Sequence, residues 1–372
     1  MPSIEGIQTE AVPDCPSCGR AGTPLYENLN DHMFGSPGSW ALSRCTSCGQ
    51  VWLNPRPIER DIGKVYKSYY THEIAWTAGS TFHAHFKNSA VSRRLVQCLS
   101  VAKQRVQESV LAVQFGYSEL RTGGMQWLLS SAVGLLPGVA RSVALQVLGL
   151  SAKERGDLLD IGCGNGLFLS RMKKLGWRTV GLETDAAAAQ IARDIFGLDV
   201  KDGHLADAGF REASFDVVTL SHVIEHVHSP EDLVMECRRL LKPNGKLIVL
   251  TPNTASLGHR VFRRSWRGLE PPRHMQCFSP QTLRACVDRT GMRIERVTTE
   301  ARTMQYIWYA SMSIRRAQRD GKRSNTAFDY IVSFVMRFVE SVAIYVVRDA
   351  GEEIMLIATK RADEESHRGG RS

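Results

Sequence analysis

A run of alternating glycines constrains the fold of this chain more than any other feature. Gly162, Gly164 and Gly166 follow the apolar run Asp157–Ile161 and precede a stretch of helical periodicity, Leu167–Leu175. Glycines at such a junction let the backbone turn tightly and approach a ligand without interference from a Cβ atom. The amide end of the following helix points to the same place and favours a carboxylate or phosphate. The junction therefore predicts a strand, a ligand-binding loop and a helix in succession.

The residues after Asp157 alternate short apolar runs with helical stretches, which is the sequence form of a parallel α/β sheet. Strands are predicted over residues 157–162, 178–182, 198–201, 215–220, 246–250, 293–298 and 353–358. Helices are predicted over residues 167–175, 186–196, 230–241 and 280–290, with a turn at 243–245 and a long helical insertion at 303–347. The predicted fold class is α/β.

The spacing of the glycines and one acid narrow the predicted ligand. Enzymes that bind dinucleotides use a related glycine loop, but with the spacing G-x-G-x-x-G, whereas the glycines here alternate. Glu183, in the run GLETD, lies just past the second predicted strand, where a carboxylate can accept hydrogen bonds from both hydroxyls of a ribose. Together these features indicate a ligand that carries a nucleoside.

Four runs, LLDIGCGNGLFL, GLETD, FDVVTLSHVIEHVHSPE and LLKPNGKLIVLTPN, occur in this order between Asp157 and Asn253. They closely resemble the class I S-adenosylmethionine-dependent methyltransferases, particularly the branch with the ubiquinone-pathway O-methyltransferases. The resemblance implies a Rossmann-like sheet of seven strands whose last strand is inserted antiparallel. It also implies which residues bind S-adenosylmethionine. Asp160, Gly162, Gly164 and Gly166 would lie at the amino-acid end of the cofactor and form its glycine loop, and Glu183 would bind the ribose. Gly203, His204 and Leu205 would flank the adenine, and Ser221 would face the cofactor.

Two histidines are candidates for the catalytic base. The sulfonium of S-adenosylmethionine is already a strong methyl electrophile, so positioning carries much of the rate, but a hydroxyl or carbon nucleophile also needs a base. His226 lies just beyond the fourth predicted strand and His274 in the loop after the fifth, where open α/β sheets bind ligands. Alternatively, Glu225 and His226 only tie this loop to a helix. The ubiquinone-pathway relatives link an E-x-x-E-H pattern to a divalent metal, but its first position here is His222.

Four cysteines form two C-x-x-C-G pairs: Cys15, Cys18, Cys45 and Cys48. The segment around them is rich in Gly, Pro and Ser and has little apolar periodicity, so it needs a staple to fold. Two thiolates from each pair suit one closed, structural zinc site, and the glycine after each pair permits a tight turn. A redox pair would be expected at the start of a helix beside a strand. The run RCTSCGQVWLNPRP resembles the zinc-ribbon head of some bacterial methyltransferases.

The predicted organisation has four parts: a zinc-ribbon segment at 1–57, a helical linker or cap region at 58–151, a Rossmann-like methyltransferase domain at 152–362 and a disordered tail at 363–372. The first twenty residues do not resemble an export signal, so we expect a cytoplasmic protein whose other cysteines are reduced.

Charge and hydropathy bear on the partners. The formal net charge of +9 suits a polyanionic partner, such as nucleic acid, anionic lipid or a phosphorylated substrate, or is only a solvated basic face. The most apolar stretches, Trp127–Leu150 and Phe328–Val347, are interrupted by proline or charge, so neither predicts a clean membrane span. We expect amphipathic helices buried within the protein, with docking on a membrane surface as the alternative.

The predicted function is methyl transfer from S-adenosylmethionine to a small molecule, such as a sugar, a polysaccharide or a lipid-linked intermediate. One alternative is an RNA methyltransferase that grips phosphates with the zinc ribbon and basic patches. The other is a non-catalytic interaction module that keeps the fold. The sequence leaves the acceptor atom and the oligomeric state open.

Overall fold

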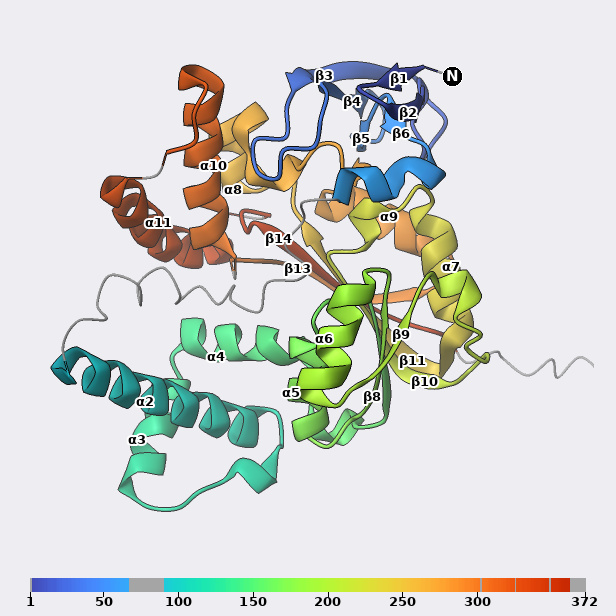
Figure 1. The fold of residues 1–372 in the computed structure, drawn as a ribbon. Coiled ribbons are helices and arrows are strands. Elements are labelled where there is room, and N and C mark those ends of the chain that lie inside the picture. The colour runs from blue at the N-terminus through green and yellow to red at the C-terminus, as the bar shows by residue number, and fades with distance from the viewer. Residues whose placement is uncertain (1, 67–89, 302, 325, 348, 362–372) are drawn as a thin grey trace, which may run out of the picture. The chain divides into compact units, whose positions relative to one another are not determined.

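The computed structural model describes residues 2–66, 90–301, 303–324, 326–347 and 349–361 (Figure 1). They form two compact units. The first contains the described residues of 1–70, 159–162 and 209–372, and the second contains those of 71–158 and 163–208. The predicted tail at 363–372 and residues 67–89 of the predicted helical region lie outside the described residues.

The large sheet has seven strands: β7 (Asp157–Ile161), β8 (Arg178–Glu183), β9 (Asp199–Asp202), β10 (Phe215–Ser221), β11 (Leu241–Pro252), β13 (Arg293–Glu300) and β14 (Glu353–Thr359). Their order is β13-β14-β11-β10-β7-β8-β9. The pairs β8/β9 and β10/β11 are parallel, whereas β14 runs antiparallel to both β11 and β13. The predicted seven-stranded sheet with an antiparallel last strand is therefore confirmed.

One predicted turn lies inside a strand. Residues 243–245 were expected to precede the fifth strand, but β11 already begins at Leu241. The register accommodates them as an irregularity, because Leu241 pairs with Phe215 and Lys246 is the next to pair, with Val217. Asn244 adopts the left-handed region, with φ of 63°, which Asn tolerates better than most residues. The turn exists as a bulge within the strand rather than before it.

The second unit contains the helices α2 (Ala90–Gln114), α3 (Met125–Gly134), α4 (Pro137–Ala144), α5 (Leu167–Lys174) and α6 (Ala186–Phe196). Among the described residues of 58–151 there are helices and turns but no strand. Asp185 caps α6, since its side chain accepts hydrogen bonds from the amides of Ala187 and Ala188. Gly197 ends α6 with φ of 59°.

The N-terminal segment forms two small sheets with short strands: β1 (Ser3–Ile4), β2 (Ile7–Glu10), β3 (Gly22–Leu29), β4 (Trp40–Cys45), β5 (Val51–Leu53) and β6 (Arg56–Pro57). One sheet has the order β1-β2-β6, and the other has the order β12-β5-β4-β3. Strand β12 (Gln276–Cys277) belongs to the loop after β11, and its two residues pair with Trp52 and Val51. The ribbon and the loop after β11, which carries His274, therefore share one sheet.

The ribbon also shares its hydrophobic core with helices from the C-terminal half of the chain. Trp40, Leu42 and Leu53 pack in one buried cluster with Phe262 of α8 (Leu257–Phe262) and Trp308 of α10 (Met304–Asp320). Each of these side chains is at most 5% exposed. The sequence predicts that the ribbon is too poor in apolar pattern to form a core by itself, and this shared cluster is how its apolar side chains are buried.

The predicted burial of the two most apolar stretches is wrong for many of their side chains. In the first stretch only the C-terminal part is buried, whereas the leucines of α3 and its following turn are 57–70% exposed: Leu128, Leu129, Leu135 and Leu136. In α11 (Ala327–Val346) the apolar face points outward, because Asp329, Ser333 and Glu340 are the buried residues. Apolar periodicity identifies the two faces of a helix but not which one the protein covers.

No single helix among the described residues is both long and apolar enough to cross a bilayer. One bent pair, Trp127–Gly134 and Gly138–Glu154, meets the length and composition criteria together, with an angle of 94° between its halves.

The start of α5 packs against α6 so closely that it requires glycine. A Cβ atom on Gly166 would lie 2.5 Å from Cδ1 of Leu198 and 2.8 Å from Cβ of Ala192, and its φ is 81°. Gly166→Ala is therefore expected to lower the free energy of unfolding by about 2–4 kcal/mol, combining left-handed strain with overpacking. Gly197→Ala is the matched control, since its φ is 59° but no atom lies within 4 Å of its Cβ position. Urea titration measures the free energy of unfolding of both variants. Gly197→Ala should lower it by only about 1 kcal/mol, and equal losses for both variants would contradict the role of close packing.

Candidate functional site

The three glycines of the loop have different roles in the structure. All three adopt positive φ, at 71°, 54° and 81° for Gly162, Gly164 and Gly166. A Cβ atom on Gly162 would lie 2.4 Å from Cγ2 of Val223, so this glycine allows close packing. Around the Cβ position of Gly164, in contrast, no atom lies within 4 Å. Gly164 is therefore the glycine beside which a ligand can approach the backbone.

Glu183 ends β8 and is only 6% exposed. Its Oε2 accepts a hydrogen bond from the amide of Gly164 at 2.7 Å, and its Oε1 accepts one from the amide of Asp185 at 2.9 Å. The amide of Gly203 donates to the main-chain carbonyl of Glu183 at 2.9 Å. The second unit thus brings Gly164, Glu183 and Gly203 together, as their predicted contact with one ligand requires. The buried carboxylate is held in place by two amide groups.

The two residues predicted to flank an adenine follow Gly203 in a short turn. His204 immediately precedes a one-turn 3-10 helix, Leu205–Asp207. His204 is exposed, whereas Leu205 is half-buried. A half-buried leucine offers an apolar surface of the kind that a purine ring can cover.

Asp160 and Ser221 lie at the ends of β7 and β10, in the first unit. Asp160 is 3% exposed, and its Oδ1 accepts a hydrogen bond from Oγ1 of Thr219 at 2.6 Å. Ser221 is half-buried and ends its strand. Both residues occupy the carboxyl ends of their strands, the edge at which open α/β sheets bind ligands.

His226 and His274 form a pair, with ring centroids 4.7 Å apart in an edge-to-face arrangement. Nδ1 of His226 lies 3.1 Å from the carbonyl oxygen of Arg273 and 2.9 Å from Oη of Tyr66. Nδ1 of His274 lies 2.8 Å from the carbonyl oxygen of Gly268. Because a carbonyl oxygen can only accept, Nδ1 carries the proton in the neutral ring of His274. The carbonyl oxygen of Arg273 favours the same tautomer in His226, in which Oη of Tyr66 also accepts from Nδ1.

The two histidines differ in accessibility. His274 is 4% exposed, and burial lowers its pKa to about 4, so its ring is neutral at physiological pH. His226 is half-buried and so is the more accessible ring of the pair.

Glu225 and His226 also tie the segment after β10 to its neighbours, as the alternative interpretation expects. The main-chain carbonyl of Glu225 accepts the amide of Met275 at 2.8 Å, and its Oε2 accepts Oγ1 of Thr251 at 2.8 Å. This structural role and a chemical role for His226 do not exclude each other, because the ties use the main chain, the Glu225 carboxylate and Nδ1 of His226.

His222 is a feature of the site that the sequence analysis noted only as a departure from the metal pattern. It follows β10 with φ of 57°, and its imidazole lies between two buried carboxylates. Nδ1 is 3.3 Å from Oε1 of Glu225, and Nε2 is 2.9 Å from Oε1 of Glu353. The His222 side chain is 40% exposed, and although its partial desolvation opposes the change, bonding to these two carboxylates raises the pKa of His222 to about 10. Burial also opposes the change in Glu225, but contact with His222 lowers its pKa to about 2.

A divalent metal fits poorly at this place. Glu225, His226 and His274 each offer a ligand atom, and these atoms lie within 4.8 Å of one another. However, the position that holds a glutamate in the metal-binding pattern holds an imidazolium here, 3.3 Å from the carboxylate that would bind the metal. His222 already neutralises that carboxylate, and a second cation beside it would be repelled.

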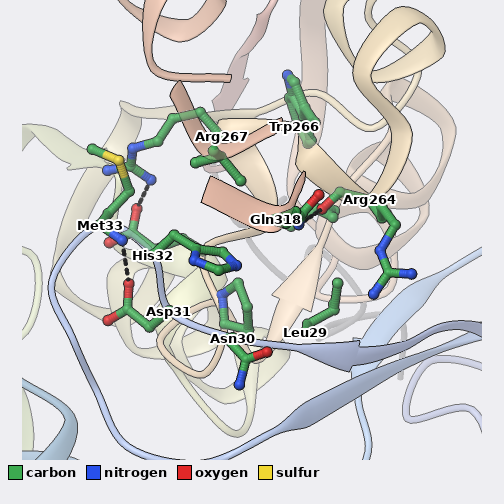
Figure 2. A pocket seen from close by; sticks show the side chains of 13 residues that line it. Leu29, Asn30, Asp31, His32, Met33, Arg264, Trp266, Arg267 and Gln318 are labelled. Atoms are coloured by element: carbon green, nitrogen blue, oxygen red, sulfur yellow. Dashed lines mark hydrogen bonds and ion pairs between the residues drawn. The ribbon is translucent and has the colours of Figure 1, made fainter. Parts of the chain in front are cut away.

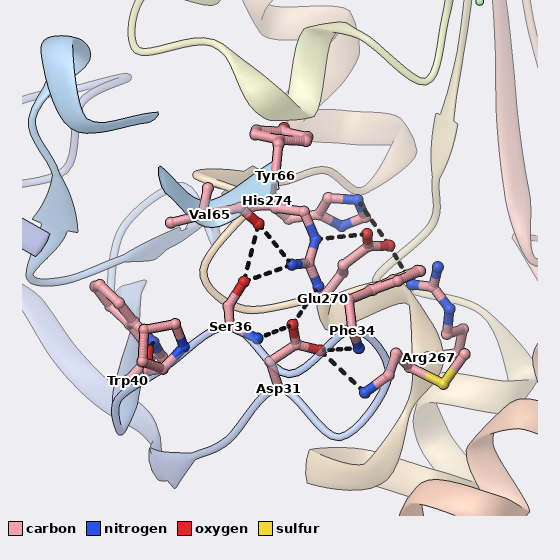
Figure 3. A network of polar contacts seen from close by, with 12 residues as sticks. Asp31, Phe34, Ser36, Trp40, Val65, Tyr66, Arg267, Glu270 and His274 are labelled. Carbon is pink, nitrogen blue, oxygen red and sulfur yellow. Dashed lines mark hydrogen bonds and ion pairs between the residues drawn. The ribbon is translucent and has the colours of Figure 1, made fainter. Parts of the chain in front are cut away.

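A buried arginine connects the ribbon to the loop that carries His274, and Figure 3 shows its partners Asp31, Ser36, Val65 and Glu270. Arg273 is 0% exposed and donates to Oε1 of Glu270 at 2.9 Å and to Oδ2 of Asp31 at 2.9 Å. It also donates to Oγ of Ser36 at 2.8 Å and to the carbonyl oxygen of Val65 at 3.1 Å. A guanidinium has five N–H donors, and these bonds engage four of them with acceptors from two distant parts of the chain.

Glu270 is the second centre of this network. Burial opposes its ionisation, but the positive charge of Arg267, together with His274 and Arg273, holds its pKa well below the usual range. Its Oε2 accepts a hydrogen bond from Arg267 and lies 3.6 Å from Nε2 of His274. No motif in the sequence marks Arg273, Glu270 or Asp31 as members of one network. The available signal was the charged run GLEPPRH, but Asp31 lies 242 residues away from Arg273 in the chain.

A small pocket lies beside this network (Figure 2). Asn30 and His32 of the ribbon line one part of it, and Arg264 and Gln318 line another. None of the predicted site residues lines this pocket, so it is a separate feature of the first unit.

The four cysteines converge on one point, as their spacing predicts. All four Sγ atoms lie within 4.8 Å of one another, with Cys15 and Cys48 3.6 Å apart and Cys18 and Cys45 3.5 Å apart. In a tetrahedral zinc site with Zn–S bonds of about 2.3 Å, sulfurs are about 3.8 Å apart. The cluster therefore fits a zinc ion bound by four thiolates.

The two cysteine pairs have the same backbone structure. In each, the amide of the glycine donates to the carbonyl of the first cysteine, at 2.9 Å for Gly19 and 3.2 Å for Gly49. Both glycines have positive φ, 66° and 77°. Neither pair lies at the start of a helix, which is where a redox pair is expected. Four ligands with no open position define a structural zinc ribbon.

The strand order of the large sheet and the glycine loop define a Rossmann-like methyltransferase. A family model described as a methyltransferase domain matches residues 139–297. A "Probable S-adenosylmethionine-dependent methyltransferase" of Mycolicibacterium smegmatis is 37% identical over 98 residues, which are 26% of this chain and 38% of that protein.

Two further relatives are ubiquinone biosynthesis O-methyltransferases. That of Maricaulis maris is 35% identical over 172 residues, or 42% of this chain and 68% of the relative. The mitochondrial enzyme of Mus musculus is 31% identical over 155 residues, or 38% of this chain and 42% of the relative. The chain thus spans less than half of the mycobacterial and mouse relatives. With these likenesses, the chain belongs to the class I S-adenosylmethionine-dependent methyltransferases and carries an N-terminal zinc ribbon.

The zinc site is expected to hold one zinc ion per chain, measured by metal analysis of the purified protein. Trp52 packs against Cys15 and Cys45, so removal of zinc with a chelator should change the tryptophan emission. In the variant Trp52→Phe, the chelator should change the tryptophan emission much less than in the wild type. Well under one metal ion per chain, or an emission change that persists in Trp52→Phe, would contradict the assignment.

Replacement of the buried arginine is expected to destabilise the protein strongly. Arg273→Met leaves Asp31 and Glu270 as buried carboxylates with fewer cationic partners, which should lower the free energy of unfolding by about 3–5 kcal/mol in a denaturant titration. Arg178→Met is the matched control, because Arg178 pairs with Asp157 at the surface with its side chain 71% exposed. That change should have an effect of about 0–1 kcal/mol. Similar losses in both variants would refute the role of the network.

Proposed function

We propose that this methyltransferase transfers the methyl group of S-adenosylmethionine to a hydroxyl oxygen of a small-molecule acceptor, with His226 as the general base. The observation that carries the proposal is the hydrogen bonding of the histidine pair. The names of the relatives from Maricaulis maris and Mus musculus support oxygen as the acceptor atom. A sugar, a polysaccharide or a lipid-linked intermediate is the class of acceptor that we infer.

His226 suits the role of base because its hydrogen bonds favour one tautomer. With the proton on Nδ1, which faces the carbonyl oxygen of Arg273, the neutral ring has its lone pair on Nε2, and this atom can accept a proton. Tyr66 and the main chain orient the ring, which keeps Nε2 in one direction. The half-buried position of His226 leaves the ring accessible to an acceptor.

His274 suits a positioning role better than proton transfer. It is buried and neutral, and its Nδ1 is held by the carbonyl oxygen of Gly268. Its edge-to-face contact with His226 restricts the rotation of the more accessible ring.

For the cofactor, we propose the residues of the resemblance in the roles that it implies. Glu183 binds the ribose hydroxyls, and Gly164 provides the open place beside the backbone. Asp160, Gly162, Gly166 and Ser221 complete the loop side, with Gly203, His204 and Leu205 at the adenine. The cofactor supplies the electrophilic methyl group, and the protein supplies orientation and a base.

Isothermal titration with S-adenosylmethionine tests the cofactor assignment. Glu183→Gln removes a charged acceptor of two hydroxyl hydrogen bonds, so the dissociation constant should rise about tenfold to a hundredfold. Asp194→Asn, a carboxylate exchange on the exposed side of α6, is the control and should leave affinity unchanged. No measurable binding by the wild type, or equal affinities for wild type and Glu183→Gln, would overturn the assignment.

The histidine roles are separated by kinetics with an accepted substrate. His226→Gln should lower kcat by about 10²–10⁴ while cofactor affinity stays unchanged, because general base catalysis contributes about that much. His274→Gln should lower kcat less, because His274 positions the neighbouring ring and does not take the proton. If His226→Gln retains full kcat, His226 is not the base.

A further inference from the structure

Helix α11 is amphipathic, but its polar residues face the protein and its apolar residues face outward. Its buried residues include Asp329, Ser333 and Glu340, which are 1%, 0% and 0% exposed. Asp329 forms an ion pair with Arg316 of α10, against which α11 packs. A helix on the surface of a protein normally turns its polar residues outward. Here the polar residues face the protein, so the outward face is the apolar one.

The outward face of α11 is large and almost free of charge. Its apolar side chains are between 43% and 80% exposed and recur every three or four residues: Phe328, Ile331, Phe334, Val335, Phe338, Val339, Val342, Tyr345 and Val346. Arg337 is the exposed charged residue among the described residues of this helix. The nine side chains form one stripe along about 30 Å of helix. Such a surface is unfavourable in water, which indicates that another apolar phase covers it.

The chain next to this face is basic. Residues 315–323, at the end of α10 and in the connection to α11, contain five basic residues and one acid, but Arg316 is paired with Asp329 and Arg319 with Asp320. Arg315 donates to the carbonyl oxygen of Val261, and Arg323 donates to that of Met33, so these bonds leave their positive charges in place. A partner that is apolar and carries negative charge at its edge complements this combination.

We propose that α11 docks on the surface of a lipid bilayer that contains anionic phospholipid. The apolar face of α11 lies in the boundary between head groups and acyl chains, and Arg315, Lys322 and Arg323 contact the phosphates. Interfacial helices bind membranes by this combination of buried apolar area and electrostatic attraction. The proposal is independent of the function proposed above.

A second copy of the chain is the less suitable occupant. Paired helices bury a narrow seam and flank it with charged residues that set the register. The apolar face of α11 is wider than such a seam. A single partner helix would leave Phe334, Val339 and Val346 exposed. A bilayer can cover apolar surfaces of any width, whereas one partner helix cannot.

Vesicle flotation of the full, zinc-loaded chain tests the proposal. The wild type should float with vesicles of phosphatidylcholine and phosphatidylglycerol in equal parts, and much less with phosphatidylcholine alone. The double variant Ile331→Ser with Phe338→Ser should lower the partition coefficient about tenfold or more. The double variant Ile195→Ser with Met235→Ser removes similarly exposed apolar side chains from α6 and α7 (Pro230–Leu240) and should bind as the wild type does.

A charge variant completes the experiment. Lys322→Gln with Arg323→Gln should reduce binding to the anionic vesicles about tenfold, towards the level seen with phosphatidylcholine alone. Zinc content and thermal midpoint of every variant are measured first, so that loss of binding is not loss of fold. The proposal is overturned if the wild type floats with neither vesicle or if the α11 variant binds like the wild type. It is also overturned if light scattering finds a wild-type dimer that the α11 variant dissociates while vesicle binding stays unchanged, since a second copy is then the occupant.

Discussion

The buried guanidinium of Arg273 is the contact on which the arrangement of the first unit depends. A charge that is removed from water must be paired and fully hydrogen-bonded, or the fold loses several kcal/mol. Arg273 is paired with Asp31 of the ribbon and Glu270 of its own loop, and it also donates to Ser36 of the ribbon. Its main-chain carbonyl meets Nδ1 of His226. One residue therefore joins the N-terminal segment, the loop after β11 and the proposed base.

The zinc ribbon consequently has a role beyond its own folding. Its strand β5 pairs with β12 of the same loop, and its aromatic side chains lie in one core with α8 and α10. A closed site with four cysteines performs no chemistry but fixes the strands that hold this loop. The proposed acceptor side is thus shaped by a segment that lies more than two hundred residues before it in the chain. The cofactor side depends instead on the short-range contact between Gly164 and Glu183.

The sequence predicts those features of the structure that depend on residues close together in the chain. The glycine loop, the seven strands and the cysteine cluster follow from short motifs whose geometry is set by neighbouring residues. The network of Arg273 could not be predicted, because Asp31 is 242 residues away and nothing local marks it as a partner. The outward apolar face of α11 was predicted as buried, since periodicity gives a helix two faces but no direction. The turn motif around Asn244 forms a bulge within β11, because this strand pairs with β10 on both sides of it.

The central claim is that the glycine loop and Glu183 bind S-adenosylmethionine, and a crystal structure with S-adenosylhomocysteine tests it most directly. Glu183 now accepts hydrogen bonds from the amides of Gly164 and Asp185. The account predicts that both ribose hydroxyls lie on the carboxylate of Glu183, that the ligand passes beside Gly164, and that the adenine lies against Leu205. Density for the ligand elsewhere, or a ribose without contact to Glu183, would contradict the account.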